Sequence, residues 1–139
     1  GYEYARHMQA NQLSPFTISP ALDDVARRNV FALRYAVTHD IFHVLLGFDT
    51  SYAGEMGVLA FAVAQNYSRS QRLGLWLASL LYPILAPRQT RQIFANRRLG
   101  LALGQQAQCL LGTRFEDMPM DAVRQQLGLP SPSPTVMSA

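Results

Sequence analysis

The sequence predicts an all-α protein, folded as a compact single-domain bundle of about six helices. Apolar residues recur at intervals of three and four along most of the 139 residues, which is the spacing of one face of an α-helix. Residues that favour helix starts and stops, such as serine before proline and isolated glycines, divide this pattern into segments. The sequence contains neither the strict alternation of a half-buried strand nor an internal repeat.

The first two predicted helices occupy the N-terminal third of the chain. A short helix is expected over residues 2–11. A longer one begins at Ser19 and Pro20, because serine is a favourable N-cap and proline suits the first helical turn. Its apolar spacing continues to about Leu46, where Gly47 is expected to end it.

The remaining helices are expected over residues 53–67, 69–85, 88–111 and 119–127. The segment 69–85 is apolar on nearly all faces and too short to cross a bilayer. It is therefore a buried helix, the wall of a lipid pocket or a helix that lies at a membrane interface. Proline and serine dominate residues 130–139, which are expected to form a mobile tail after a domain of residues 1–129.

The charge is distributed unevenly. All twelve basic residues are arginines, and residues 56–115 contain seven of them and no acidic residue. Such a basic block suits an anionic membrane surface or a ligand with phosphate or carboxylate groups, although a solvated arginine face has the same composition. No nucleic-acid-binding motif accompanies it, so nucleic acid is not an expected partner. The single cysteine, Cys109, excludes an internal disulfide, and no apolar run of about 18 residues indicates a transmembrane helix.

The chemically distinctive residues are two histidines four positions apart and two acids, namely His39, Asp40, His43 and Glu55. A helix places positions i, i+3 and i+4 on one patch, so the first three converge. A short polar loop framed by Gly47 and Gly54 lets the next helix fold back and bring the glutamate to them. Two imidazoles and two carboxylates form a suitable site for a divalent metal such as zinc.

The residues alone leave two interpretations of this patch open. In the first, His39 and His43 bind a metal with the spacing of the zincin histidine pair. The acid follows the first histidine directly, so the zincin general base is not matched, and Asp40 is either a ligand or a partner that orients an imidazole. In the second, His43 and Asp40 form a hydrogen-bonded pair without metal, and Glu55 is an acid favoured by the helix dipole. A His-Asp phosphohydrolase would need further ligands, and only His7 remains.

The pattern His-Asp-x-x-His, eleven residues, Glu resembles the metal motif of the coenzyme Q (ubiquinone) biosynthesis protein family, member four. The likeness extends from about residue 2 to residue 129. Phe115 stands where this family often has tryptophan. The other matching segments are Arg34-Tyr35, Gly54-Glu55, Gln65, Arg114-Phe115-Glu116 and residues 123–129.

The resemblance implies an all-helical protein peripheral to a membrane, with zinc, or alternatively Mg²⁺, Fe²⁺ or Co²⁺, bound by His39, Asp40, His43 and Glu55. It implies oxidative decarboxylation at C1 of a polyprenylated hydroxybenzoate, with the metal ligands as the catalytic residues. The alternative is a non-catalytic scaffold that binds isoprenoid lipid and organises the quinone biosynthetic complex. The expected partners are the polyprenylated precursor, the membrane surface, other enzymes of quinone biosynthesis and a second copy of the chain. The expected location is the matrix side of the mitochondrial inner membrane, or the cytoplasmic face of a bacterial membrane.

A prenylated hydroxybenzoate needs a cation for its acid group and an apolar channel for its tail. Arg34, one helical turn before His39, is the candidate for the carboxylate, although a surface salt bridge explains it equally. The candidates for a lipid-binding channel would also fit an ordinary core: Phe42, Phe61, Trp76, Leu80 and Tyr82. No flavin or nicotinamide motif is present and zinc is not redox-active, so the oxidation is expected to use oxygen at the metal or a partner.

Overall fold

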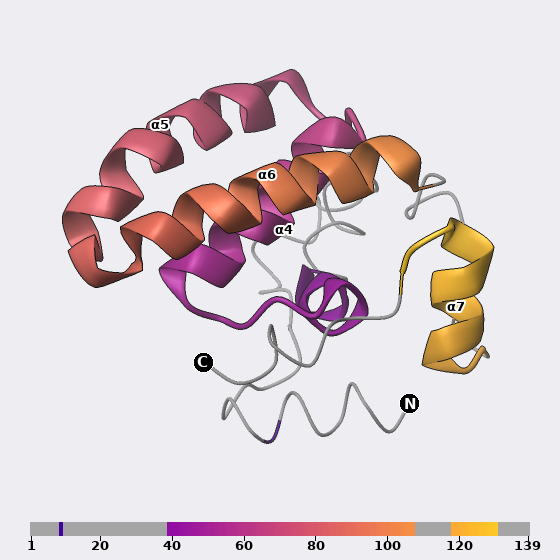
Figure 1. Ribbon diagram of the computed structural model, residues 1–139. Coiled ribbons are helices and arrows are strands. Elements are labelled where there is room, and N and C mark those ends of the chain that lie inside the picture. Colours follow the sequence, from indigo (N-terminus) through magenta and orange to yellow (C-terminus); the bar gives the residue numbers. More distant parts are fainter. Residues whose placement is uncertain (1–8, 10–38, 108–117, 131–139) are drawn as a thin grey trace, which may run out of the picture.

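The computed structural model describes residue 9, residues 39–107 and residues 118–130. This part of the chain is helical and contains no strand (Figure 1), which confirms the predicted all-α class. It has five helices with defined bounds, where about six were expected for the whole chain: α4 (Tyr52–Ala64), α5 (Arg69–Leu85), the 3₁₀ helix η2 (Pro87–Gln89), α6 (Thr90–Gln106) and α7 (Met120–Leu127). Residues 39–46 are also helical and are called the histidine helix below.

Several predicted helix ends agree with the structure. Helix α5 has the predicted bounds, and Gly47 and Gly128 adopt the left-handed conformation (φ 76° and 73°) just after the histidine helix and α7. The helix predicted from residue 88 begins instead at Thr90, because Pro87 first starts a 3₁₀ turn. The predicted helix over residues 2–11, the start at Ser19, the helix end at residue 111 and the tail after residue 130 lie outside the described residues.

Helices α4 and α6 run in the same direction and pack closely side by side (Figure 1). The close approach depends on two glycines of α6 spaced four residues apart. A Cβ atom at Gly100 would collide with the carbonyl oxygen of Gly57, and one at Gly104 would lie 2.6 Å from the carbonyl oxygen of Phe61. Helix α5 lies between them in the sequence and runs in the opposite direction, which allows α4 and α6 to be parallel.

Helix α4 ends three residues earlier than predicted, because Gln65 leaves it to bind α6. The Gln65 side-chain amide donates to the carbonyls of Gly104 (2.8 Å) and Ala107 (3.1 Å), which lie at the C-terminal end of α6. The next residue, Asn66, adopts a left-handed conformation with φ 58° and turns the chain toward α5. Gln65 therefore fixes the ends of two helices at once.

Two apolar clusters meet at α4. The first joins α4 to the histidine helix, α6 and α7, and its largest fully buried members are Phe42, Leu45, Phe61 and Leu127. The second joins α4 to α5 and α6 through Met56, Ala60, Leu75, Ala78 and Ile93. Helices α4 and α6 contribute to both clusters and together form the centre of the described fold.

Helix α7 is also held to the histidine helix by hydrogen bonds. Arg124 donates from Nη2 to the carbonyl of Val44 (2.8 Å) and from Nε to the carbonyl of Leu45 (3.0 Å). These carbonyls belong to the last helical turn, where no intrahelical donor remains, and a cation is favoured there by the helix dipole. Among the described helices, none combines the length and the apolar character that crossing a membrane requires.

Candidate metal centre

A tight loop brings α4 back beside the histidine helix. Asp49 stabilises this loop by accepting hydrogen bonds from the Ser51 hydroxyl (2.6 Å) and the Ser51 amide (3.1 Å). Ser51 is in turn the N-cap of α4, since its hydroxyl accepts from the amide of Gly54 at 3.2 Å. Glu55 therefore lies in the first turn of α4, next to the histidines.

Gly54 permits this arrangement because it has no side chain. A Cβ atom at position 54 would collide with the backbone carbonyl of Asp49 and with its carboxylate. The loop can therefore press directly against the start of α4. The predicted role of Gly47 and Gly54 as the frame of the loop thus has a steric basis, and it determines how closely Glu55 approaches the histidine helix.

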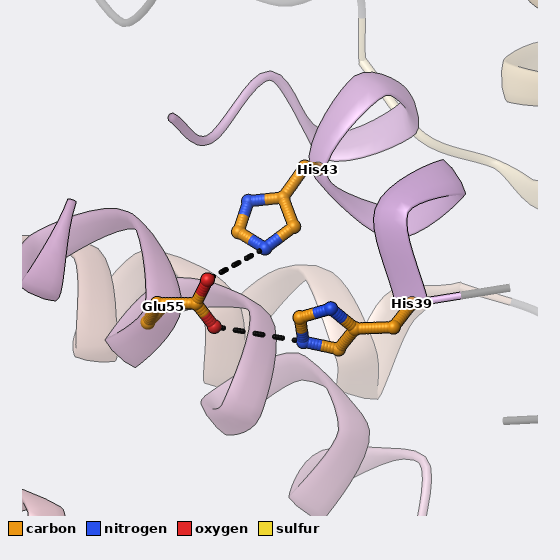
Figure 2. A group of neighbouring side chains, drawn as sticks. All are labelled: His39, His43 and Glu55. Carbon is orange, nitrogen blue, oxygen red and sulfur yellow. Dashed lines mark ion pairs between the residues drawn. The ribbon is translucent and has the colours of Figure 1, made fainter. Parts of the chain in front are cut away.

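Three of the four predicted ligands converge (Figure 2). The Nε2 atom of His43 lies 3.2 Å from Oε1 of Glu55, and the Nε2 atom of His39 lies 3.5 Å from Oε2 of the same carboxylate. One donor atom from each of the three residues falls within 4.8 Å of the others. Donor atoms around tetrahedral zinc, bound at about 2.0–2.2 Å, lie roughly 3.3–3.6 Å apart. The two separations between histidine and glutamate are close to this range, although the 4.8 Å spread of the three donors is wider, so the residue types and their convergence fit a metal that draws the donors closer.

The Nδ1 atoms of both histidines face other partners, which directs the Nε2 atoms toward Glu55. His43 is 1% exposed, and its Nδ1 lies 3.2 Å from the carbonyl oxygen of Phe48, which can accept its N–H. Nδ1 of His39 lies 3.8 Å from Oδ1 of Asp40. Such partners set the tautomer and orientation of a metal-binding imidazole. Sequence reasoning missed Phe48, because a backbone carbonyl leaves no signal in the residue type.

Asp40 is not brought into the group of converging donors. Its carboxylate lies beside His39 on the side away from the Nε2 atom that faces Glu55. Of the two roles predicted for Asp40, ligand or partner of an imidazole, this position favours the second. The group that fits a metal is therefore His39, His43 and Glu55, here called the metal cluster.

The two histidines of the metal cluster have opposite pKa shifts. Burial lowers the pKa of His39 below its ordinary 6.5 and outweighs the attraction of Glu55. Burial acts on His43 in the same direction, but its hydrogen bond to Glu55, the charge of that carboxylate and the nearby carbonyls raise the pKa overall. The pKa of Glu55 is lowered, because its contacts with His43 and the charge of His39 outweigh its own burial.

In the metal-free protein, we therefore expect His43 to hold its proton to a higher pH than His39. The raised pKa of His43 stabilises the fold below pH 6.5 and loses this effect as the pH rises through the folded pKa. The lowered pKa of His39 costs stability as the pH falls from 6.5 through its folded pKa. NMR titration of the imidazole resonances measures both pKa values.

Glu55→Gln tests the cause of this split. It should lower the pKa of His43 relative to that in the unmodified protein, since burial is then opposed only by the backbone carbonyls and no longer by the carboxylate. Asp121→Asn, at an exposed acid outside the metal cluster, should leave both histidines unchanged. A His43 pKa that stays high in Glu55→Gln would contradict the assigned cause.

The side chains predicted to line a lipid channel do not lie together. Phe42 and Phe61 are fully buried and meet edge to face in the core, with ring centroids 6.1 Å apart. Trp76 and Leu80 point outward from α5 and are 60% and 54% exposed. Sequence spacing cannot distinguish the inner from the outer face of a helix that is apolar all round, so it did not show that these two side chains lie on the outer face, and the lipid channel stays a prediction.

Tyr82 is half-buried on the inner side of α5 and packs against Tyr52, with ring centroids 5.1 Å apart. Burial raises the pKa of its phenol, and the charge of Glu55 and the neighbouring Tyr52 raise it further. Tyr82 is therefore near the metal cluster and protonated at neutral pH. The predicted head-group residue Arg34 lies outside the described residues.

Comparison with known proteins identifies relatives along nearly the whole chain. The family model for "Coenzyme Q (ubiquinone) biosynthesis protein Coq4" matches residues 1–133. The mitochondrial ubiquinone biosynthesis protein COQ4 homologue of Rattus norvegicus is 32% identical over 139 aligned residues that cover 95% of the chain, and its Homo sapiens counterpart is 31% identical over the same share. The chain spans about half the length of these relatives, 51% in both cases.

A solved structure has the same fold. The crystal structure of a protein from Nostoc punctiforme PCC 73102, described as a ubiquinone biosynthesis protein, superposes with a TM-score of 0.74 at 26% sequence identity. The match covers 94% of this chain and 62% of the Nostoc chain. The arrangement of the helices around the metal cluster is therefore that of a known fold.

Proposed function

The chain belongs to the Coq4 family of coenzyme Q (ubiquinone) biosynthesis proteins, and from that premise we propose that it catalyses a metal-dependent step of this pathway. The proposed step is oxidative decarboxylation at C1 of a polyprenylated hydroxybenzoate. One observation carries the proposal: donor atoms of His39, His43 and Glu55 converge from two helices to within 4.8 Å of one another, and the two imidazole–carboxylate distances, 3.2 Å and 3.5 Å, are close to those around zinc. Mg²⁺, Fe²⁺ and Co²⁺ are alternatives for the same donors.

The reaction replaces a carboxyl group by a hydroxyl group. The bond between C1 and the carboxyl carbon breaks, carbon dioxide leaves, and a bond forms between C1 and an oxygen atom supplied by water. The ring gives up two electrons, and the oxidant we assign is dioxygen, which takes these electrons with two protons and becomes hydrogen peroxide. A bound divalent metal would act as a Lewis acid on the carboxylate or on a ring oxygen.

The protein residues would hold and shield this centre. His43 is buried and anchored to the Phe48 carbonyl, so it offers Nε2 from a fixed position that excludes water. Glu55 faces both imidazoles and supplies the negative charge of the cluster. Asp40 orients His39 from the other side. Tyr82 keeps its proton and can donate a hydrogen bond near Glu55 to an anionic oxygen.

Metal analysis and an assay of carbon dioxide release test this function. We expect one zinc per chain, and release of labelled carbon dioxide from a carboxyl-labelled prenylated hydroxybenzoate only in the metal-loaded protein. Treatment with a chelator should stop the release, and added metal should restore it. Undiminished release from fully metal-free protein would contradict the proposed mechanism.

A second candidate function is a non-catalytic scaffold that binds isoprenoid lipid and organises other quinone biosynthetic enzymes at a membrane, with homodimerisation as part of its assembly. The outward apolar side chains of α5 favour it, because they suit a lipid or protein surface. The proposed site of action is the matrix face of the mitochondrial inner membrane, or the cytoplasmic face of a bacterial membrane. Co-purified lipid without any turnover of the metal-loaded protein would favour this function over catalysis.

A further inference from the structure

Helix α5 turns its large apolar side chains away from the protein. Six of them recur at intervals of three and four and are 50% to 75% exposed: Leu73, Trp76, Leu77, Leu80, Leu81 and Ile84. At this spacing they form one continuous stripe along the helix, here called the outer stripe. Exposed apolar patches of this kind mark interaction sites rather than ordinary surface.

The inner face of α5 packs against α4 without the help of the outer stripe. Leu75 and Ala78 are buried against Met56 and Ala60 of α4. Figure 1 shows α5 at the edge of the helical group, beside α6. The outer stripe therefore contributes nothing to the described core, and the fold alone does not account for its leucines, isoleucine and tryptophan.

The charges around the outer stripe identify the kind of partner. Exposed arginines stand at both ends of α5: Arg69 and Arg72 in its first turns, and Arg88 and Arg91 just beyond its end. Cations at the start of a helix oppose its dipole, so helix formation does not explain Arg69. Arg72 also donates to Oδ1 of Asn66 at 2.7 Å, which leaves its guanidinium exposed at the start of the outer stripe. No acidic residue occurs between positions 56 and 115. A second copy docked through this face would bring like charges together, whereas an anionic lipid surface is complementary to it.

We propose that α5 lies flat on an anionic lipid bilayer, with the outer stripe in the boundary between headgroups and acyl chains and the four arginines at the phosphates. A helix with an apolar face and basic residues is the usual form of such an interfacial element. This surface rests on the membrane location named with the second candidate function and adds which helix makes the contact, but it does not depend on the metal chemistry proposed above. It would nevertheless place α4, which carries Glu55, about one helix diameter, roughly 10 Å, from the lipid-facing helix.

The only tryptophan of the chain lies in the outer stripe and reports on this contact directly. Vesicles of phosphatidylcholine mixed with phosphatidylglycerol should shift the Trp76 emission to shorter wavelength, and vesicles of phosphatidylcholine alone should shift it much less. Salt should weaken the binding, because it screens the arginines. The Arg69→Gln/Arg72→Gln variant should lose about 30-fold in affinity for anionic vesicles, since each of the two cations near such a surface adds about 1 kcal/mol and about 1.4 kcal/mol is tenfold.

Apolar-to-polar variants inside and outside the outer stripe test whether vesicle binding depends on the outer stripe or on any exposed leucine. Leu77→Gln/Leu80→Gln should reduce vesicle co-sedimentation by about 10-fold or more, given the large difference between leucine and glutamine at an interface. Leu99→Gln, at an exposed leucine of α6, should leave it unchanged. All variants should keep their zinc content, which distinguishes failure of this proposal from failure of the proposed function.

Two results would overturn the membrane proposal. The first is vesicle binding by Leu77→Gln/Leu80→Gln at the level of the unmodified chain. The second is an unmodified chain that does not bind anionic vesicles but forms a dimer, measured by light scattering, while the Leu77→Gln/Leu80→Gln variant is a monomer. That second result would assign the outer stripe to a second copy of the chain.

Discussion

Replacing Glu55 with glutamine is expected to lower the zinc affinity by about 100-fold or more, because even residues that only orient metal ligands contribute 10- to 100-fold. The substitution keeps the size of the side chain but removes the negative charge that faces Nε2 of both histidines, at 3.2 Å and 3.5 Å. A competition titration against a chromophoric chelator measures the affinity. Asp121→Asn is the control, since it removes an acid that is 94% exposed and outside the metal cluster; its partner Arg124 should keep the hydrogen bonds from Nε and Nη2 to Leu45 and Val44, because Asp121 contacts only Nη1.

Two further measurements refine this expectation. Asp40→Asn should weaken zinc binding less than Glu55→Gln does, because Asp40 contacts His39 from the side away from Glu55. The affinity should also fall as the pH drops below the raised pKa of His43, since zinc then competes with a proton for Nε2. Equal zinc affinities of the Glu55→Gln and unmodified proteins would remove Glu55 from the ligand set.

Replacing Gly100 with alanine is expected to destabilise the protein by about 2–3 kcal/mol. The added methyl group would collide with the carbonyl oxygen of Gly57 and lie 3.0 Å from Cβ of Ala60, so α4 and α6 would have to separate. Backbone atoms cannot move aside as the end of a flexible side chain can. Urea denaturation followed by circular dichroism gives the free energy of unfolding.

The control is the same substitution at another helical glycine. A Cβ atom at Gly74 of α5 would meet nothing within 4 Å. Gly74→Ala should therefore stabilise the protein by up to about 1 kcal/mol, through helix propensity alone. If Gly100→Ala and Gly74→Ala changed the stability equally, the tight packing of α4 on α6 would have no energetic role.

Local signals in the sequence were sufficient to predict the ends of some helices. Ser68 caps the start of α5 with its side chain, and Pro87 follows its end, so both bounds are coded by adjacent residues. The end of α4 is different. Gln65 leaves that helix to bind carbonyls of α6 that are 39 and 42 positions away, and no local pattern reveals such a contact.

The candidate site was predictable to a similar extent. The spacing of His39 and His43, with a loop short enough to return Glu55, led to the three residues that converge. The spacing predicts on which side of the helix Asp40 lies, but it does not predict where its short side chain points. In the structure the carboxylate of Asp40 lies beside Nδ1 of His39. The family resemblance added the identity of the pathway, and the family match over residues 1–133 confirms it.

The sequence could not predict which side chains of α5 face outward, for a physical reason. Apolar residues on nearly all faces leave no polar side to mark where solvent lies, so Trp76 and Leu80 could be assigned inward only by assumption. The two buried candidates, Phe42 and Phe61, belong to the core that joins α4 to the histidine helix. The segment 69–85 is apolar on nearly all faces, and the structure shows that most of its large apolar side chains face outward.

The hydrogen bonds from Arg124 to the carbonyls of Val44 and Leu45 make the geometry of the metal cluster depend on a distant part of the chain. Arg124 touches no ligand, yet it restrains the helical turn that follows His43 from a position 80 residues further along the chain. The position of the histidines therefore depends on α7 as well as on the residues that supply the donor atoms. A shortened chain that ended before α7 would still carry every proposed ligand but would lose the support that holds the histidine helix in place.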